Sequence, residues 1–310
     1  MYGLEGRVAV VTGGGRGIGR GIAVALGAAG ARVVVNDFFR EGARGAADDV
    51  VAEIQAAGGT GLANGGDVSS FSGGQALIDA AVAEYGRVDI LVTCAGNFWP
   101  DMTLAVTQER WHAQLAVHAT GTFACAQAAA RHMTEQGEGG RIITFSSRGA
   151  FFGPTPAYAA AKGAVMAMTA ALSADLSARG ITANCILPSA TTQLFPGDDA
   201  TARTFGGVAA AQSLDPDDIA PLVVYLATPA AASITGRYLY AAGGDICVYP
   251  QPTSVGGGGS TYLRKADGRW TVEEIAEVLP AIIGVGGDGQ IWSAERVTAL
   301  SDSLFKSSTS

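Results

Sequence analysis

The chain has 310 residues and a formal net charge of −8, with 48% apolar and only 15% charged residues, which excludes a mainly disordered chain. The acidic balance argues against nucleic acid as a partner, because phosphate binding needs clustered Lys and Arg. There is no apolar run of about 20 residues that would predict a membrane span, and no basic-then-apolar start that would predict a signal peptide, so a cytoplasmic protein is expected.

Short β-branched runs alternate along the chain with alanine-rich helical stretches. Strands are predicted at residues 8–11, 33–35, 90–93, 142–145 and 181–187, and helices at residues 22–29, 46–57, 75–85, 111–134 and 157–178. This alternation indicates βαβ units and a parallel sheet. Because the strand runs are apolar throughout, both faces of the sheet should be covered by helices. The sequence therefore predicts an α/β fold with a doubly wound parallel sheet, which binds its ligand at the carboxyl ends of the strands.

Two regions depart from this alternation. Residues 191–212 follow the predicted strand at residues 181–187, are rich in Thr, Ala and Gly, and are predicted to form a lid over the site. The chain divides into a main domain at residues 1–249 and an extension at residues 250–310, which begins with prolines and a run of glycines typical of a flexible segment. The extension is expected to pack on the main body or on a neighbouring subunit.

Within the extension, the sequence predicts a hairpin and one helix. Residues 261–264 and 269–270 flank an Asp-Gly turn, a pattern typical of a β-hairpin. Thr271, with Glu274 three residues later, forms a capping box and predicts a helix from there through Val278.

A glycine-rich motif follows the first predicted strand and opens the first helix. Its residues read Thr12-Gly13-Gly14-Gly15-Arg16-Gly17-Ile18-Gly19. Glycines let the backbone approach a pyrophosphate, and the helix N-terminus offers N–H groups and a positive partial charge. A glycine cluster also fits a simple tight turn, but its place between strand and helix favours the binding of a dinucleotide.

Asp37 ends the second predicted strand, 24 residues after the first glycine of the motif. A carboxylate here accepts hydrogen bonds from both hydroxyls of an adenosine ribose and repels a 2′-phosphate, so NAD is favoured over NADP. Arg16 and Arg40 favour the opposite choice, since a guanidinium can hold a 2′-phosphate. Asp67 and Val68 lie between the predicted strands at residues 33–35 and 90–93, where they are expected to meet the adenine.

A tyrosine and a lysine, Tyr158 and Lys162, stand four residues apart at the start of the helix that follows the predicted strand at residues 142–145. This spacing puts both side chains on one face of the helix, and Ser146 and Ser147 end the preceding strand. A phenol with a pKa of about 10 is a poor base at neutral pH, but a nearby ammonium and a positive nicotinamide favour the phenolate. We therefore predict a lowered pKa for Tyr158 and a serine hydroxyl that holds the substrate oxygen.

These motifs stand in the order and at roughly the spacing of the short-chain dehydrogenase/reductase (SDR) family, which the chain resembles from about residue 6 to residue 249. The resemblance implies a Rossmann-type seven-stranded sheet, NAD(P) binding, and hydride transfer between C4 of nicotinamide and a carbonyl carbon. It implies that Tyr158 is the acid/base, that Lys162 binds the nicotinamide ribose, and that Ser147 orients the substrate oxygen. The other cofactor contacts that it implies are Ala95, Gly96, Pro188 and Thr192.

The chain departs from the family pattern at three places. The family's Asn-Asn-Ala-Gly after the fourth strand reads Thr-Cys-Ala-Gly here, with Cys94 in place of the second asparagine. His118 stands where the family has an asparagine that supports a water of the proton relay, so a part in the relay and a structural role are both open. Ser147 lies only 11 residues before Tyr158, and Ser146 is the alternative serine.

No metal site is predicted, because the four cysteines are far apart and the histidines lack a second ligand at the required spacing. The cysteines lie in apolar segments and are expected to be reduced and buried. An apolar substrate pocket is expected from aromatic residues near the predicted site, namely Phe98, Trp99, Phe151, Phe152 and Phe195.

Together these features predict an NAD(H)-dependent alcohol dehydrogenase or ketone reductase acting on a small-molecule substrate. Around residues 35–37 and 117–118 the chain resembles the 3-hydroxyacyl-CoA dehydrogenase and oxoacyl reductase branch, so a 3-hydroxyacyl thioester is the first candidate substrate. A bulky apolar alcohol, such as a hydroxysteroid or terpenoid, is the alternative, and a cofactor-binding scaffold without turnover is a remote one. Low charge and two long apolar helices predict a homo-oligomer, either a tetramer or a dimer.

Overall fold

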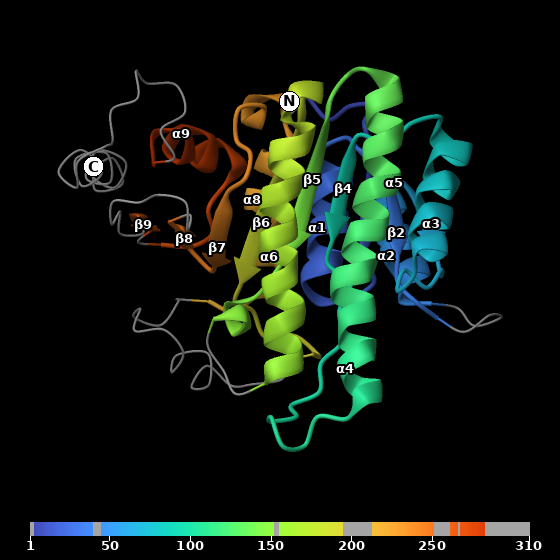
Figure 1. Cartoon of the computed structure of the whole chain (residues 1–310). Coiled ribbons are helices and arrows are strands. Elements are labelled where there is room, and N and C mark those ends of the chain that lie inside the picture. Colours follow the sequence, from blue (N-terminus) through green and yellow to red (C-terminus); the bar gives the residue numbers. More distant parts are fainter. Residues whose placement is uncertain are drawn as a thin grey trace.

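The computed structural model describes residues 3–39, 45–151, 155–194, 213–250, 261–265 and 267–282. Its strands are β1 (Val8–Thr12), β2 (Arg32–Asn36), β3 (Thr60–Asn64), β4 (Ile90–Thr93), β5 (Gly140–Phe145), β6 (Ile181–Pro188), β7 (Tyr238–Ala242), β8 (Asp245–Val248) and β9 (Thr261–Arg264). In the described residues they form one sheet with the order β3-β2-β1-β4-β5-β6-β7-β8-β9 (Figure 1). Strands β1 to β7 are mutually parallel, and β8 and β9 are added antiparallel at the edge.

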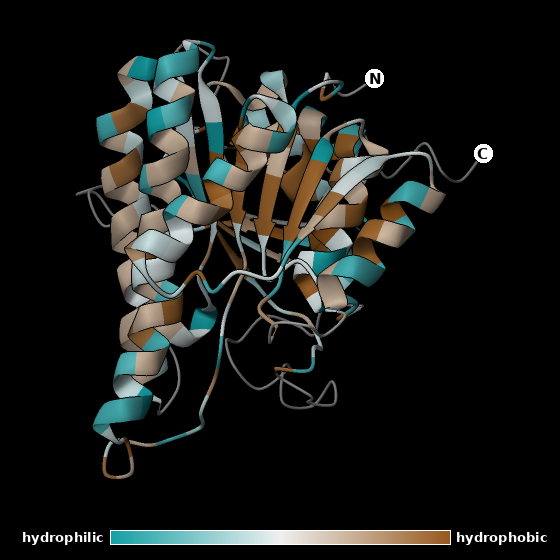
Figure 2. Ribbon diagram, turned by 90° about the vertical axis from the view of Figure 1, so that its right-hand side faces the viewer, coloured by the Kyte–Doolittle hydropathy of each residue, from teal (hydrophilic) through white to brown (hydrophobic). Residues whose placement is uncertain are grey.

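Helices cover both faces of this sheet, as the alternating sequence predicts. The longer helices of the described residues are α1 (Gly17–Ala28), α2 (Ala46–Ala56), α3 (Phe71–Tyr85), α4 (Gln108–Leu115), α5 (Gly121–Gln136), α6 (Pro156–Leu176), α8 (Ala220–Ala227) and α9 (Val272–Ile282). Helices α1, α2, α8 and α9 enclose one apolar core, while α3, α5 and the end of α6 enclose the other (Figure 1). The central strands are apolar along their length and lie between these helices (Figure 2), so burial on both faces stabilises the sheet.

The strand order reverses between β1 and β4, and this reversal positions the site. Strand β1 pairs with β2 on one side and with β4 on the other, and Thr12 is the register partner of both Asn36 and Thr93. The loops that leave the carboxyl ends of β1 and β4 therefore turn away in opposite directions. A crevice opens at such a point in a doubly wound sheet, and ligands bind there.

The predicted fold class is confirmed, and two predictions about the elements need correction. The described sheet has nine strands instead of seven, because β8 and β9 extend it beyond the parallel part. The predicted helix at residues 111–134 is divided into α4 and α5 by a π-helical turn at Ala116–Thr120. Such a turn inserts an extra residue into the helix and is common at functional sites.

The extension beyond residue 250 follows the sequence prediction only in part. The capping box is confirmed, since the Thr271 hydroxyl accepts the Glu274 N–H at 3.2 Å and the Glu274 carboxylate accepts the Thr271 N–H at 2.8 Å. The hairpin between residues 261–264 and 269–270 is wrong, because β9 pairs with β8. The open edge of β8 offers the main-chain partners that the hairpin would have supplied.

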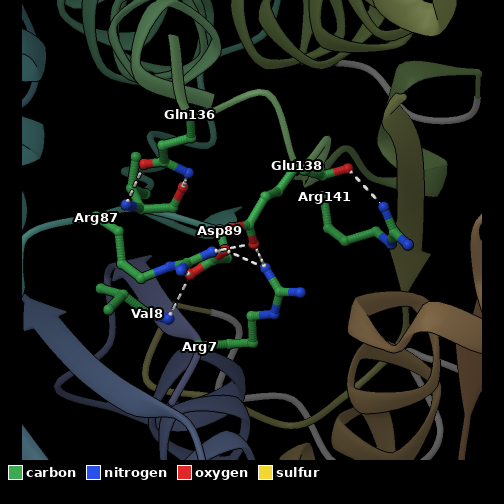
Figure 3. A network of polar contacts seen from close by, with 9 residues as sticks. Arg7, Val8, Arg87, Asp89, Gln136, Glu138 and Arg141 are labelled. Atoms are coloured by element: carbon green, nitrogen blue, oxygen red, sulfur yellow. Dashed lines mark hydrogen bonds and ion pairs between the residues drawn. The ribbon is translucent and has the colours of Figure 1, made fainter. Parts of the chain in front are cut away.

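An ion-pair network lies at the opposite end of the sheet from the crevice. Asp89, just before β4, accepts hydrogen bonds from Arg7 and Arg87 and from the Val8 N–H, and Glu138 bonds to both arginines (Figure 3). Burial opposes ionisation of Asp89, but these bonds together hold the pKa of its carboxyl below the usual value. The network therefore joins the amino-terminal ends of β1, β4 and β5 and has no part in the site.

Candidate active site

A cleft of about 1060 Å³ opens at the carboxyl ends of the parallel strands. Its volume lies at the upper end of the range for ligand pockets, roughly 300–1,000 Å³, and so suits a ligand as large as a dinucleotide. The structure brings almost all the sequence-predicted site residues to its walls, namely Gly13, Arg16, Gly17, Ile18, Gly19, Asp37, Asp67, Val68, Ala95, Gly96, His118, Ser147, Tyr158, Lys162, Pro188 and Thr192. Gly15 is the exception, and it lies behind the wall against Asp37.

The glycine motif forms a cradle that has no room for side chains. Gly13 has a φ of +64°, and a Cβ atom there would lie 2.7 Å from the Cα of Ala95. A Cβ atom on Gly19 would lie 2.1 Å from the Gly13 carbonyl oxygen. Because α1 begins at Gly17, its free N–H groups face the cleft at this point. The cradle therefore fits a pyrophosphate, whose close approach needs bare backbone and helix N–H donors.

Asp37 closes the far side of this cradle. Its carboxylate accepts the Gly15 N–H at 3.0 Å, and Arg16 is near enough for its charge to act on it. Burial raises the pKa of Asp37, while Arg16 and the Gly15 hydrogen bond lower it. Arg16 also lines the cleft, so the carboxylate and the guanidinium both lie within reach of a bound ribose. Arg40 lies outside the described residues.

Tyr158, Ser147 and Lys162 meet at the other end of the cleft. Tyr158 lies in the first turn of α6, only 5% exposed, and hydrogen-bonds to Ser147. The Ser147 hydroxyl oxygen accepts the Gly149 N–H at 3.0 Å, which holds it toward the cleft. Lys162 lies one turn further along α6, with Nζ 5.8 Å from the centre of the Tyr158 ring. The predicted spacing of four therefore places both groups on the cleft face of the helix.

The two neighbouring serines have different partners. The Ser146 hydroxyl donates to the Lys162 carbonyl oxygen at 2.8 Å, and Ser146 is only 3% exposed at the inner wall of the cleft. Ser146 thereby fastens β5 to α6, and Ser147 is the serine that faces Tyr158. Lys162 is tied to the same strand, because its ammonium donates to the Phe145 carbonyl oxygen at 2.8 Å.

The predicted lowering of the Tyr158 pKa does not occur in the chain by itself. Burial raises the pKa of Tyr158 to about 12, and the Ser147 hydrogen bond lowers it only in part. Burial also lowers the pKa of Lys162 to about 8. Desolvation penalises either charge and so shifts both pKa values toward the neutral forms, but Lys162 still carries its charge below about pH 8. A phenolate at Tyr158 therefore requires a further positive charge in the cleft.

His118 lies in the π-helical turn and packs edge-to-face on Tyr158, with ring centres 5.5 Å apart. Its Nε2 lies 2.7 Å from the Asn97 carbonyl oxygen, and its Nδ1 has no hydrogen-bond partner in the described residues. Burial, and then the charge of Lys162, lower the pKa of His118 to about 3, so the ring is neutral. A neutral ring with Nε2–H donating to Asn97 leaves Nδ1 as a buried acceptor.

Asn97 is a site residue that sequence reasoning missed. Its amide donates to the Ala113 carbonyl oxygen at 3.1 Å, and its main chain contacts the ring of His118. It therefore ties the loop after β4 to helix α4 and to the π-helical turn. The signal in the sequence was its place directly after Ala95-Gly96, where a polar residue follows a backbone cradle.

The predicted aromatic pocket is present only in part. Phe98 lines the cleft and packs edge-to-face on Tyr158 at 5.1 Å, and Phe151 is 55% exposed beside Tyr249 at 6.2 Å. Trp99 does not line the cleft. Phe152 and Phe195 lie outside the described residues, as does the predicted lid beyond Leu194.

Cys94 is the cysteine that reaches the cleft, at the position where the family pattern has asparagine. Burial raises the pKa of its thiol to about 11, so it is a neutral thiol at physiological pH. None of the four cysteines forms a disulfide, and the other three are buried.

Across the described parts of the chain, no three His, Cys, Asp or Glu side chains gather in a way that could hold a metal ion. No helix in those same parts is long and apolar enough to cross a membrane.

Comparison with known proteins identifies relatives that share this architecture. A family model described as Enoyl-(Acyl carrier protein) reductase matches residues 13–245. The chain is 36% identical over 252 residues to an uncharacterized oxidoreductase of Methylorubrum extorquens, covering 79% of the chain and 99% of that relative. A 3-oxoacyl-[acyl-carrier-protein] reductase of Synechocystis is 35% identical, with 79% of the chain and 99% of the relative covered. Hydroxyacyl-CoA dehydrogenase ChsB1 of Mycobacterium tuberculosis is also 35% identical, with 80% and 81% covered.

A solved structure extends the similarity toward the C-terminus. The crystal structure of a short chain dehydrogenase from Mycobacterium avium superimposes with a TM-score of 0.71 at 32% identity. It covers 94% of this chain and 99% of that one. The family model, by contrast, ends at residue 245, before β9 and α9.

Proposed function

Because the chain belongs to the short-chain dehydrogenase/reductase family, we propose that it is an NAD(H)-dependent oxidoreductase that interconverts a secondary alcohol and a ketone. The observation that carries this proposal is the meeting of Tyr158, Ser147 and Lys162 with the glycine cradle in one cleft. An acid/base group beside a dinucleotide cradle suits carbonyl and alcohol chemistry.

The cleft residues divide the binding of the cofactor among them. The cradle of Gly13 to Gly19 holds the pyrophosphate, Asp37 holds the adenosine ribose, and Asp67 with Val68 meets the adenine. The backbone of Ala95 and Gly96 lets the cofactor approach closely. Pro188 and Thr192, on the other wall of the cleft, meet the nicotinamide carboxamide. When bound, the cofactor supplies the hydride acceptor or donor. NADP is the less favoured nucleotide, because the Asp37 carboxylate lies in the cradle and would repel a 2′-phosphate.

The chain's own groups then manage the proton and the substrate oxygen. The Ser147 hydroxyl, held by Gly149, donates to the substrate oxygen, and Tyr158 gives or takes the proton on that oxygen. Lys162 holds the nicotinamide ribose and favours the phenolate form of Tyr158. His118 contributes a neutral ring that fixes Asn97 and offers Nδ1 to a water of the proton relay.

A 3-hydroxyacyl thioester is the proposed substrate, and a bulky apolar alcohol is the second candidate. The thioester is supported by the names of two relatives, a 3-oxoacyl-[acyl-carrier-protein] reductase and a hydroxyacyl-CoA dehydrogenase. It is also supported by Arg148, which lines the cleft next to Ser147 with its guanidinium 5.4 Å from the centre of the Tyr240 ring, where a cation favours an anionic carrier. The apolar alcohol is supported by Phe98 and Leu194 in the cleft wall.

A substrate screen with the purified chain tests this proposal. NAD⁺ reduction would be followed with 3-hydroxyacyl-CoA, hydroxysteroid and terpenoid alcohols, with NADP⁺ as the parallel cofactor. Turnover of a thioester above the other classes supports the first candidate, and turnover of the apolar alcohols alone supports the second. Tight nucleotide binding without turnover of any class contradicts the enzyme and favours a scaffold. We further propose that the chain acts in the cytoplasm and forms a homo-oligomer, a tetramer or a dimer. The oligomer is supported by helices α5 and α6, which are long and weakly charged.

The pH dependence of carbonyl reduction should follow Lys162. Burial lowers its pKa to about 8, so the ammonium is present below this pH and is lost as pH rises through it. Tyr158, with a pKa of about 12, keeps its proton across this range and remains able to donate it. We expect kcat/KM for reduction to be flat below pH 8 and to fall above it, since kcat/KM reports groups of the free enzyme. A profile that remains flat to about pH 10 would contradict the role of Lys162.

A further inference from the structure

The extension beyond residue 250 makes specific polar contacts with the main body. The Arg269 guanidinium donates to the Asp215 carboxylate at 2.5 Å and, through Nε, to the Asp218 carboxylate. The Trp270 indole N–H donates to the Gly244 carbonyl oxygen, and its ring is buried in the core shared by α1, α8 and α9. The Lys265 ammonium donates to the Arg269 carbonyl oxygen at 2.7 Å and so stabilises the main chain next to Trp270. We call Lys265, Arg269 and Trp270 the clasp.

The partners of the clasp belong to the segment that borders the cleft. Residues 213–218 include Leu214, which lines the cleft, and the Leu214 carbonyl oxygen accepts the Thr191 N–H at 2.8 Å. Thr192, the next residue, packs on the cradle, since its methyl group would lie 3.3 Å from a Cβ atom on Gly17. The contact path therefore runs from Arg269 through residues 213–218 to the wall of the cofactor site.

The same segment also touches the helix that carries the cradle. Asp217 lies against Gly21 of α1 so closely that a Cβ atom there would come within 2.4 Å of its carboxylate, and Arg20 is 3.6 Å from that carboxylate. A shift of residues 213–218 would therefore disturb the cleft wall at Thr191 and the packing of α1 against Asp217.

Arg269 is the charged partner that makes this segment stable. The Asp218 side chain is 1% exposed, and its second oxygen has no hydrogen-bond partner in the described residues. A buried carboxylate that loses its counter-charge is strongly destabilising, because the ion then lies in an apolar setting without compensation. Without Arg269, the segment would have to rearrange to bring Asp218 to water.

We propose that the C-terminal extension fixes the position of one wall of the cofactor site through this clasp, with Arg269 as a positioning residue for cofactor binding. This inference rests on the proposed function in that it assumes the cleft binds a nicotinamide dinucleotide. The hydrogen bonds of the clasp go to residues other than Tyr158 and Lys162, so we expect it to act on cofactor affinity and to leave the chemical step unchanged. Its residues lie beyond the end of the family model at residue 245.

The test compares Arg269→Met with Arg179→Met in the full-length chain. Arg179 is a matched control, because its side chain is similarly exposed, at 47% against 51%, and pairs with Asp175 away from the cleft. The Kd for NADH would be measured by nucleotide fluorescence, together with kcat at saturating cofactor and the Tm of the free protein. We expect the Kd to rise about five- to tenfold in Arg269→Met, equivalent to about 1–1.4 kcal/mol, with kcat within about twofold of wild type. Arg269→Lys should recover part of the affinity, because it restores the charge but not both hydrogen bonds.

Hydrogen exchange distinguishes a positioning role of Arg269 from a general effect on stability. In Arg269→Met, amides of residues 213–218 should exchange faster, and NADH should protect residues 188–194 less than in wild type. An unchanged Kd in Arg269→Met overturns the clasp, as does a lowered Tm without any change in Kd.

Two further outcomes keep the clasp separable from the proposed function. If Arg269→Met does not fold, Asp215→Asn decides by the same measurements, because Asp215 is the exposed partner and its loss leaves no buried charge unpaired. A rise in Kd for Asp215→Asn supports the clasp, and an unchanged Kd overturns it. If wild type binds neither NADH nor NADPH, the proposed function falls and the clasp with it, whereas equal binding by wild type and variant removes the clasp alone.

Discussion

Replacement of Tyr158 by phenylalanine should lower turnover by at least about 100-fold, the usual scale for loss of a general acid/base. The substitution removes only the hydroxyl, so the ring still packs edge-to-face on Phe98 and His118. The Kd for NADH should therefore stay within about twofold of wild type. The measurement is kcat with the best substrate of the screen, together with an NADH titration of the same preparation.

A matched control for this variant lies on the neighbouring strand. The Tyr238 hydroxyl is buried and donates to the Met166 carbonyl oxygen of α6 at 3.0 Å, away from the cleft. Tyr238→Phe should cost about 1 kcal/mol of stability through the lost hydrogen bond and leave turnover near that of wild type. His118→Asn should also remain active, because an amide can replace the ring in bonding to Asn97. Turnover retained in Tyr158→Phe would remove Tyr158 from the mechanism.

The second large effect concerns the choice between NAD⁺ and NADP⁺. A 2′-phosphate near Asp37 would bring like charges within a few ångströms, which costs about 4 kcal/mol per charge pair at an effective dielectric constant of ~20. Solvent screening reduces this to about 2–3 kcal/mol, a preference of roughly 30- to 150-fold. Arg16 opposes it, but an exposed charge pair contributes only about 0–1 kcal/mol. We therefore expect kcat/KM for NAD⁺ to exceed that for NADP⁺ at least about tenfold.

Variants of the two carboxylates at this end of the cleft test the assignment. Asp37→Ala should shrink the NAD⁺ preference, because the repulsion is lost while Arg16 stays. Asp37→Asn should act in the same direction and still accept the Gly15 N–H. Asp67→Asn is the control, since it removes a cleft carboxylate but keeps an acceptor for the Ser69 N–H, and should leave the ratio unchanged. A wild type that prefers NADP⁺ would show that Arg16, or Arg40, recognises the ribose instead.

Features that depend on residues close together in the chain are predictable from the sequence. The doubly wound sheet follows from the alternation of apolar strand runs with alanine-rich helices, because each run must be buried on both faces. The cradle follows from a glycine motif placed between a strand and a helix. The pair Tyr158 and Lys162 reaches one face of α6 through helical spacing alone, and the capping box at Thr271 is a contact three residues long.

Other features depend on partners far along the chain, and only the tertiary structure decides them. Residues 261–264 look like half of a hairpin, but the open edge of β8 is a better partner than the short run after the turn. Ser146 and Ser147 are indistinguishable in sequence, and the position of α6 engages the Ser146 hydroxyl with the Lys162 carbonyl oxygen and places Ser147 beside Tyr158. The π-helical turn at His118 likewise has no local signal.

The pKa values of the site and the contacts of the clasp also depend on residues far apart in the chain. The spacing of Tyr158 and Lys162 predicts mutual stabilisation of their charges, but the depth of their burial raises one pKa to about 12 and lowers the other to about 8. Desolvation depends on everything packed around a group, and a sequence pattern does not contain that sum. Arg269 meets Asp215 and Asp218 across more than 50 residues of chain, so its partners follow from the packing of the extension on the body, which local pattern cannot specify.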